Sequence, residues 1–299
     1  MECRCDRRRV SAVPSVASYR QTSQKGRYTM STPEGKDIWA SGAAYEPYVG
    51  RWSRLVARTF LQWLAVPLQA SWLDVGCGTG ALSQTIVEVA SPHAVVGVDP
   101  SEAYLAYARR QIQDSRAEFR LGDAQALPVE SATYDAAICG LVLNFVPHPD
   151  QALKEMVRAV RAGGTVAAYV WDYADQMQLM RYFWNAAVAL DPAAEPLDEG
   201  QRFPLCHPEP LQQLFQTRQL ENVEVRPIDV PTQFRTFEEY WSPFLGGQGP
   251  APGYALSLSE ERRIALREQL RAVLPLAHDG SIQLIARAWA VRGVQNGTP

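Results

Sequence analysis

The stretch Ser71–Gly80, SWLDVGCGTG, constrains the fold of this 299-residue chain more than any other. A short apolar run leads into three glycines at alternate positions, Gly76, Gly78 and Gly80, and apolar residues then recur with helical spacing over 82–89. This order predicts a buried strand, a tight turn and a helix. Glycines let the backbone turn sharply and approach a ligand closely. The free N–H groups at the start of the helix attract an anionic ligand group.

The spacing of the glycines separates this loop from two better-known nucleotide loops. The pattern is D-x-G-x-G-x-G, whereas the dinucleotide fingerprint is G-x-G-x-x-G. No lysine follows Gly80, so the loop also differs from the phosphate-binding G-x-x-x-x-G-K-[ST] loop. An NAD-dependent oxidoreductase is therefore the disfavoured alternative.

The chain from Tyr45 to about Val170 resembles the class I S-adenosylmethionine (SAM)-dependent methyltransferases. Within them it is most similar to the small-molecule group that includes the C-methyltransferases of ubiquinone and menaquinone biosynthesis. The segment LDVGCGTG matches the nucleotide-loop motif of that superfamily almost letter for letter. The resemblance implies an α/β, Rossmann-like three-layer sandwich. Its seven-stranded sheet is expected to be mostly parallel, with one antiparallel strand near the C-terminus.

Acidic residues stand where such a fold binds a nucleoside. Asp99 ends a predicted strand over 94–98, nineteen residues after Gly80. In nucleotide-binding α/β folds an acid at about this distance accepts hydrogen bonds from the ribose hydroxyls. A plain strand-end cap is the alternative, because Asp-Pro is a common turn.

The resemblance extends the expected SAM-binding set along the chain. Asp123 and Ala124 match the family's adenine-binding position. Tyr45 and Arg51 match its N-terminal lid, where the Arg fork would bind the methionine carboxylate or else form a surface ion pair. Ligands lie beyond the carboxyl ends of parallel strands, which places Gly140 and Leu141 beside the cofactor. The complete expected set is Tyr45, Arg51, Asp74, Gly76, Cys77, Gly78, Gly80, Asp99, Pro100, Asp123, Ala124, Gly140 and Leu141.

Methyl transfer from SAM is an in-line displacement, so an enzyme of this kind mainly aligns the acceptor and excludes water. A base is needed only if the acceptor must lose a proton. His148 and Tyr45 are the weak candidates for a catalytic group, and Tyr45, Trp171 and Tyr173 are candidates to line the acceptor pocket. Asn144 is either a helix-ending cap or a substrate contact. No cluster of His, Cys, Asp and Glu has metal-ligand spacing, so no metal is expected.

The chain divides into an extension and one large domain. Residues 1–36 lack hydrophobic periodicity and are predicted to be disordered, with Met30 as the natural start. Residues 37–299 are expected to form the methyltransferase domain, with lid helices over 37–66 and substrate-cover insertions over 172–256. A helix of about 14 residues is predicted to begin near Arg51.

Two helix starts are read from capping signals. Asp150 is expected to cap a helix that ends at 162–164, before a strand over 165–171. Ser257 with Glu260 reads as a capping box, and 246–253 reads as a loop.

Charge and cysteine content narrow the function classes. Residues 1–29 hold seven Lys or Arg and two acids, so the remainder of this −3 chain carries −8. Such a body is a poor nucleic-acid surface. Five cysteines without a C-x-x-C pair favour a reducing, cytoplasmic location. The expected function is methyl transfer from SAM to a small organic molecule by a monomer or homodimer. A non-catalytic SAM-binding regulatory partner and a protein methyltransferase are the alternatives.

Overall fold

The structure is a computed structural model, and it describes residues 29–32, 35–38, 50–246 and 249–296. Tyr45 and the stretch 1–28 therefore lie outside the described residues. Strands β1 (Thr29–Thr32) and β2 (Gly35–Ile38) pair as a small antiparallel hairpin, which begins within residues 1–36, the segment expected to be disordered, and extends to Ile38.

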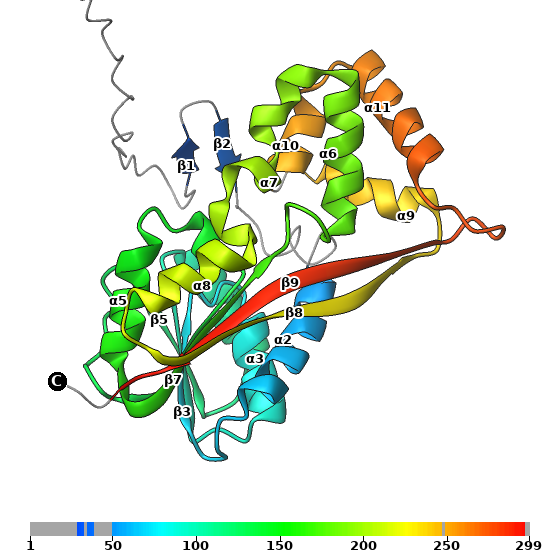
Figure 1. The fold of residues 1–299 in the computed structure, drawn as a ribbon. Coiled ribbons are helices and arrows are strands. Elements are labelled where there is room, and N and C mark those ends of the chain that lie inside the picture. The colour runs from blue at the N-terminus through cyan, green and yellow to red at the C-terminus, as the bar shows by residue number, and fades with distance from the viewer. Residues whose placement is uncertain (1–28, 33–34, 39–49, 247–248, 297–299) are drawn as a thin grey trace, which may run out of the picture.

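A twisted seven-stranded sheet forms the centre of the molecule (Figure 1). Its strands are β3 (Ser71–Val75), β4 (Ala94–Asp99), β5 (Ala117–Leu121), β6 (Tyr134–Gly140), β7 (Val160–Trp171), β8 (Glu221–Phe234) and β9 (Ile282–Val294). They are ordered β5-β4-β3-β6-β7-β9-β8. The first five strands are parallel, and β9 runs antiparallel to both of its neighbours. This confirms the predicted sheet with its one reversed strand near the C-terminus.

Helices cover both faces of this sheet. Helices α2 (Arg51–Leu64) and α3 (Ala81–Val89) share one apolar core with alternate residues of β3, β6 and β7. Helices α5 (Pro149–Ala159) and α8 (Pro208–Gln216) share a second core with the opposite face of these strands. Helix α4 (Glu102–Gln111) packs its Leu105 and Ala108 against Phe119 of β5. Side chains alternate between the faces of a strand, so two separate cores arise from one sheet.

Helix α2 begins at Arg51 and has 14 residues, as predicted. Trp52, Val56 and Phe60 recur on one face and are buried, because residues three and four apart share one side of a helix. The Phe60 ring packs on Tyr169 of β7 with centroids 4.8 Å apart. This contact seats the first turn of α2 close to the carboxyl ends of the central strands.

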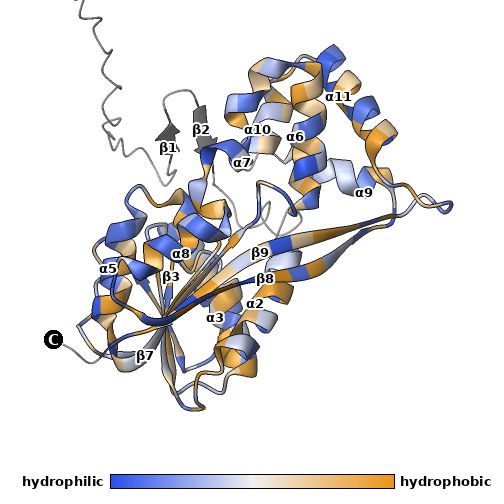
Figure 2. Cartoon of the chain, viewed as in Figure 1, coloured by the Kyte–Doolittle hydropathy of each residue, from blue (hydrophilic) through white to orange (hydrophobic). Residues whose placement is uncertain are grey.

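A group of helices stands over the far ends of β8 and β9 (Figure 1). It contains α6 (Gln178–Leu190), α7 (Glu199–Arg202), α9 (Phe237–Trp241), α10 (Pro250–Ser257) and α11 (Glu260–Val273). Buried apolar residues of α6, α9, α10 and α11 belong to one core cluster, and α6 and α11 each carry both hydrophobic and hydrophilic residues (Figure 2). Phe183 of α6 stacks on Phe244 with centroids 4.4 Å apart. Much of the expected substrate cover thus folds as a small helical unit, whereas α8 packs on the sheet.

Four helix boundaries differ from the sequence expectation. Helix α5 starts after His148, because Pro149 takes the first helical position, where its fixed φ and missing N–H fit. It ends at Ala159, and β7 already begins at Val160, ahead of the Gly-Gly pair. The capping box expected at Ser257 is wrong, since Ser259 caps α11 by accepting from the N–H of Arg262. The loop expected over 246–253 instead enters α10 at Pro250.

Within the described ranges, no helix combines the length and the apolar character that crossing a membrane requires.

Candidate functional site

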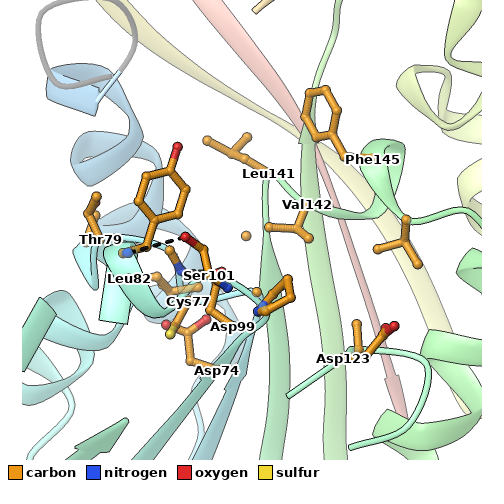
Figure 3. A pocket seen from close by; sticks show the side chains of 18 of the residues that line it. Asp74, Cys77, Thr79, Leu82, Asp99, Ser101, Asp123, Leu141, Val142 and Phe145 are labelled. Atoms are coloured by element: carbon orange, nitrogen blue, oxygen red, sulfur yellow. Dashed lines mark hydrogen bonds between the residues drawn. The ribbon is translucent and has the colours of Figure 1, made fainter. Parts of the chain in front are cut away.

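A cavity of about 370 Å³ opens where the parallel strands end (Figure 3). Its walls come from the loops after β3, β4, β5 and β6 and from α2 and β7. The lining residues are Ser53, Asp74, Gly76, Cys77, Gly78, Thr79, Ala81, Leu82, Asp99, Pro100, Ser101, Tyr104, Asp123, Ala124, Gln125, Gly140, Leu141, Val142, Phe145, Val146, Pro147 and Tyr169. The carboxyl edge of a parallel sheet is where open α/β folds bind ligands.

The glycine loop forms one wall of the cavity through its backbone. Gly76, Gly78 and Gly80 have φ of +74°, +53° and +88°, a region that side chains with a Cβ rarely adopt. The N–H of Gly76 donates to the carbonyl of Val98 on the neighbouring strand at 2.8 Å. A Cβ at Gly76 would lie 2.6 Å from Val142. The loop therefore requires glycine at position 76 both for its conformation and for space.

Asp99 is held rigidly at the end of β4. Its Oδ2 accepts from the N–H of Gly78 at 2.9 Å, and its Oδ1 accepts from the N–H of Ser101 at 2.9 Å. A carboxylate offers about four acceptor positions, so roughly two remain for a ligand. Burial raises the pKa of Asp99 above its usual range, although both backbone N–H groups oppose the shift. The strand-end cap considered for Asp99 is thus present, and the same carboxylate also lines the cavity.

Asp74 of β3 is only 1% exposed. Its Oδ2 accepts from the hydroxyl of Ser83 on α3 at 2.6 Å. Its Oδ1 is buried and has no hydrogen-bond partner within the described part of the chain. Burial raises the pKa of Asp74 to about 7, and the nearby charge of Asp99 adds to the shift. An orphaned carboxylate oxygen of this kind is stabilised by a donor, best by a cationic one.

Asp123 lies across the cavity from Thr79 (Figure 3). Its Oδ1 accepts from the N–H of Gln125 at 2.8 Å, which fixes the turn that follows β5. The side chain is exposed to solvent at the rim. Ala124, the next residue, lines the same wall.

The remaining wall is apolar and follows β6. Leu141 has a φ of +63°, an unusual conformation for leucine, and its N–H donates to the carbonyl of Tyr169 at 2.8 Å. Figure 3 shows Leu141, Val142 and Phe145 along this side of the cavity. The ring of Phe145 in turn contacts the ring of Phe203 edge to face, with centroids 5.1 Å apart.

The structure brings together ten of the thirteen residues expected to bind a cofactor: Asp74, Gly76, Cys77, Gly78, Asp99, Pro100, Asp123, Ala124, Gly140 and Leu141. Gly80 does not line the cavity but supplies the N-cap of α3. Tyr45 is outside the described residues. Arg51 is not among the lining residues, because its guanidinium pairs with Glu239 of α9 at 2.9 Å.

The weaker candidates lie elsewhere. His148 is exposed at the start of α5 and does not line the cavity. Trp171 and Tyr173 are buried in the core and do not line it either. Asn144 lies in a short 3-10 turn, Leu143–Phe145, where its Oδ1 is buried without a hydrogen-bond partner among the described residues.

Sequence reasoning missed several lining residues, among them Ser53, Tyr104 and Tyr169. Tyr104 lies one turn into the helix that Ser101 caps, so the capping signal after Asp99 could have located it. Ser53 and Tyr169 carry no local signal, because their positions depend on how α2 packs on β7. In the residues that the structure describes, no three His, Cys, Asp or Glu side chains are grouped to hold a metal ion.

Comparison with known families gives one match over the centre of the chain. Residues 73–168, from β3 to β7, match the family described as a methyltransferase domain. This interval contains the glycine loop, Asp99, Asp123 and the Gly140–Leu141 turn.

Curated relatives match the same part of the chain. The chain is 37% identical over 109 residues to a 2-phytyl-1,4-naphtoquinone methyltransferase of Thermosynechococcus vestitus, covering 36% of this chain and 48% of the relative. It is 30% identical over 148 residues to a trans-aconitate 2-methyltransferase of Variovorax paradoxus, covering 49% and 55%. A demethylmenaquinone methyltransferase of Roseiflexus castenholzii is 37% identical over 95 residues, covering 32% and 40%. The chain thus spans about half or less of the length of these relatives.

Solved structures share the fold at low identity. A phosphoethanolamine N-methyltransferase 2 of Haemonchus contortus, in complex with SAM, aligns with a TM-score of 0.53 and 14% identity. That alignment covers 87% of this chain and 62% of the other. The YcgJ protein of Bacillus subtilis aligns with a TM-score of 0.51 and 17% identity, covering 82% and 99%. These likenesses establish the architecture of the sheet and its helices.

Proposed function

We propose that this chain, which matches a methyltransferase-domain family over residues 73–168, is a class I SAM-dependent methyltransferase that transfers the methyl group of SAM to a small organic acceptor. One observation carries the proposal. The cavity is lined by three carboxylates, Asp74, Asp99 and Asp123, and its described lining includes no Lys, Arg or His. Such a site suits a positively charged nucleoside and disfavours a dinucleotide with two phosphates. SAM carries a sulfonium and an ammonium.

The lining residues fit the parts of this cofactor. Asp99 has acceptor positions left for the two ribose hydroxyls. The orphaned Oδ1 of Asp74 is suited to the ammonium group. Asp123 and Ala124, at the rim after β5, are suited to the adenine. When bound, SAM supplies a methyl group that is already activated by its sulfonium.

The protein's own part in the reaction is alignment and exclusion of water. Leu141, Val142 and Phe145 form an apolar wall beside the loop after β6, which keeps water from that side of the cavity. None of the described lining side chains is a histidine, so an acceptor that must lose a proton would pass it to a carboxylate or a tyrosine of the lining. The named relatives act on a naphthoquinone and on trans-aconitate, both of them small organic molecules.

We propose that Arg51 binds the methionine carboxylate of SAM. The carboxylate of Glu239 competes with it for the Arg51 guanidinium. The pair is partly exposed, so it contributes little stability by itself and can exchange. We expect Glu239→Gln to strengthen SAM binding about threefold by releasing the guanidinium, and Arg51→Ala to weaken it about tenfold, since a charged hydrogen bond contributes about 1.5 kcal/mol. Calorimetric titration with SAM checks both variants. If neither changes the affinity, Arg51 serves only the contact between α2 and α9.

Asp74 makes the binding of SAM depend on pH. Its pKa in the free protein is about 7, and only the ionised form pairs with an ammonium. The ionised fraction of Asp74 is about 0.9 at pH 8 and about 0.1 at pH 6, whereas the α-amino group of SAM becomes fully protonated over the same range. The affinity for SAM should therefore fall about fourfold from pH 8 to pH 6. Titrations across this range check the slope, and Asp74→Asn should flatten it. An equal slope in that variant would assign the titration to another group.

The same shift has the opposite sign for the stability of the free protein. The folded state keeps the proton of Asp74 up to about pH 7, whereas the unfolded chain loses it near pH 4. Between these values the folded state binds more protons, so this residue makes unfolding harder as the pH falls from 7 to 4.

Calorimetric titration of the purified chain with SAM, S-adenosylhomocysteine (SAH) and NAD tests the proposed function. We expect both SAM and SAH to bind while NAD gives no signal. A panel of small quinols, polycarboxylates and amines is then screened for SAH formation. If the folded protein binds neither SAM nor SAH, the proposal is overturned. Binding without turnover of any acceptor would favour a non-catalytic SAM-binding partner.

A further inference from the structure

Tyr169 is a polar residue of the cavity lining that belongs to β7, two strands along the sheet from the strand of Asp74. Along the sheet the strands run β4, β3, β6 and β7, and their carboxyl ends carry Asp99, Asp74, Gly140 and Tyr169 in that order. If the proposed function holds, Asp99 takes the ribose and Asp74 the ammonium. The sulfonium joins these two ends of SAM and therefore lies near the ends of β4 and β3. The next two strands along the sheet, β6 and β7, line the cavity beside it through Gly140 and Tyr169.

Gly140 leaves room for the hydroxyl of Tyr169. The two residues are register partners on parallel strands. A Cβ at position 140 would lie 2.7 Å from Oη of Tyr169 and 2.8 Å from its Cζ. The phenol oxygen therefore lies directly against the backbone of Gly140, at the point where β6 reaches the cavity.

The phenol ring is fixed in this position. Tyr169 is only 2% exposed, and its ring packs on Phe60 of α2. Its carbonyl accepts from the N–H of Leu141, whose positive φ turns the chain away after Gly140. A rigid oxygen on an apolar wall is a preorganised acceptor, because it needs no rearrangement when the ligand arrives.

We propose that the hydroxyl oxygen of Tyr169 contacts the sulfonium methyl group of SAM and makes the cavity prefer SAM over SAH. A methyl group on a sulfonium carries part of the positive charge, so its C–H groups donate weak hydrogen bonds to oxygen. SAH lacks both that methyl and that charge. The contact also orients the methyl group, so Tyr169 is a positioning residue for the transfer.

The experiment compares dissociation constants for SAM and SAH in the full chain and in Tyr169→Phe, which removes only the oxygen. We expect the SAM/SAH affinity ratio to fall about three- to tenfold, with SAH binding changed less than about twofold, the range that one such contact produces. Tyr134→Phe is the matched control. Tyr134 is a buried tyrosine at the opposite end of β6, and its variant should keep the wild-type ratio.

Ser53 is the rival oxygen, since it also lines the cavity while donating its own proton to the carbonyl of Gly50. The assignment would be overturned if Tyr169→Phe kept the wild-type SAM/SAH affinity ratio, or if Ser53→Ala lowered that ratio and Tyr169→Phe did not. If Tyr169→Phe is poorly folded, Gly140→Ala displaces the hydroxyl by contact and must lower the same ratio. Failure of the wild-type chain to bind SAH at all would reject the proposed function rather than the role of Tyr169.

Discussion

Replacing Asp99 by alanine should weaken SAM binding by about two orders of magnitude or more. Two ribose hydroxyls donating to one carboxylate form two charge-assisted hydrogen bonds, each contributing about 1.5 kcal/mol or more. Their loss totals about 3 kcal/mol, and each 1.4 kcal/mol is a factor of ten in affinity. Calorimetric titration with SAH measures this without any methyl acceptor. An unchanged affinity would remove Asp99 from the ribose site.

The Asp99 variant needs a control for its effect on the turn. Asp99 accepts from the N–H of Ser101 two residues ahead, and Asp114 accepts from the N–H of Arg116 in the same way. Asp114 is not among the lining residues of the cavity. Asp114→Ala should therefore lose a comparable hydrogen bond in a turn, while its affinity for SAH stays at the wild-type value. Asp99→Asn keeps one carbonyl acceptor, so its affinity should lie between those of Asp99→Ala and the wild type.

The positions of the glycine loop and of the acidic residues Asp99 and Asp123 could be predicted because a short stretch of sequence specifies each of them. The order of apolar run, glycines and helical repeat around 71–89 fixes a strand, a turn and a helix within one short segment. Asp99 and Asp123 each end a short strand, and parallel strands bring such ends to one edge. The alternation of strands and helices was therefore enough to place Asp99 beside the glycine loop, whereas Asp123 was expected mainly from the resemblance to the methyltransferases.

Residues positioned by long-range packing could not be predicted in this way. Arg51 and Glu239 are 188 positions apart, and their ion pair exists only because α9 lies close to the start of α2. Tyr169 looks like any core residue in an apolar strand, and its place at the cavity follows from the register of β7 on β6. Helix α5 shows a second limit, since Asp150 is expected to cap it, whereas His148 takes the cap position and Pro149 the first helical position.

Gly76→Ala should be among the most destabilising single changes in the loop. Alanine at a φ of +74° costs about 1 kcal/mol of stability. The new Cβ would also lie 2.6 Å from Val142, an overlap that costs about 1–3 kcal/mol more. We expect the free energy of unfolding, measured by urea titration, to fall by about 3 kcal/mol. Gly76 and Val142 both line the cavity, so Gly76→Ala should also weaken the binding of SAH.

Gly163→Ala separates the two causes of that loss. Gly163 has a φ of +77°, almost that of Gly76, but nothing lies within 4 Å of the Cβ it would gain. Its substitution should therefore cost only the conformational part, about 1 kcal/mol. The overlap part is tested by adding Val142→Ala to Gly76→Ala. The double variant should be more stable than the sum of the single losses predicts, by about 1 kcal/mol or more. Equal losses at positions 76 and 163, with no coupling to Val142, would mean that the loop after β6 does not press against the glycine loop.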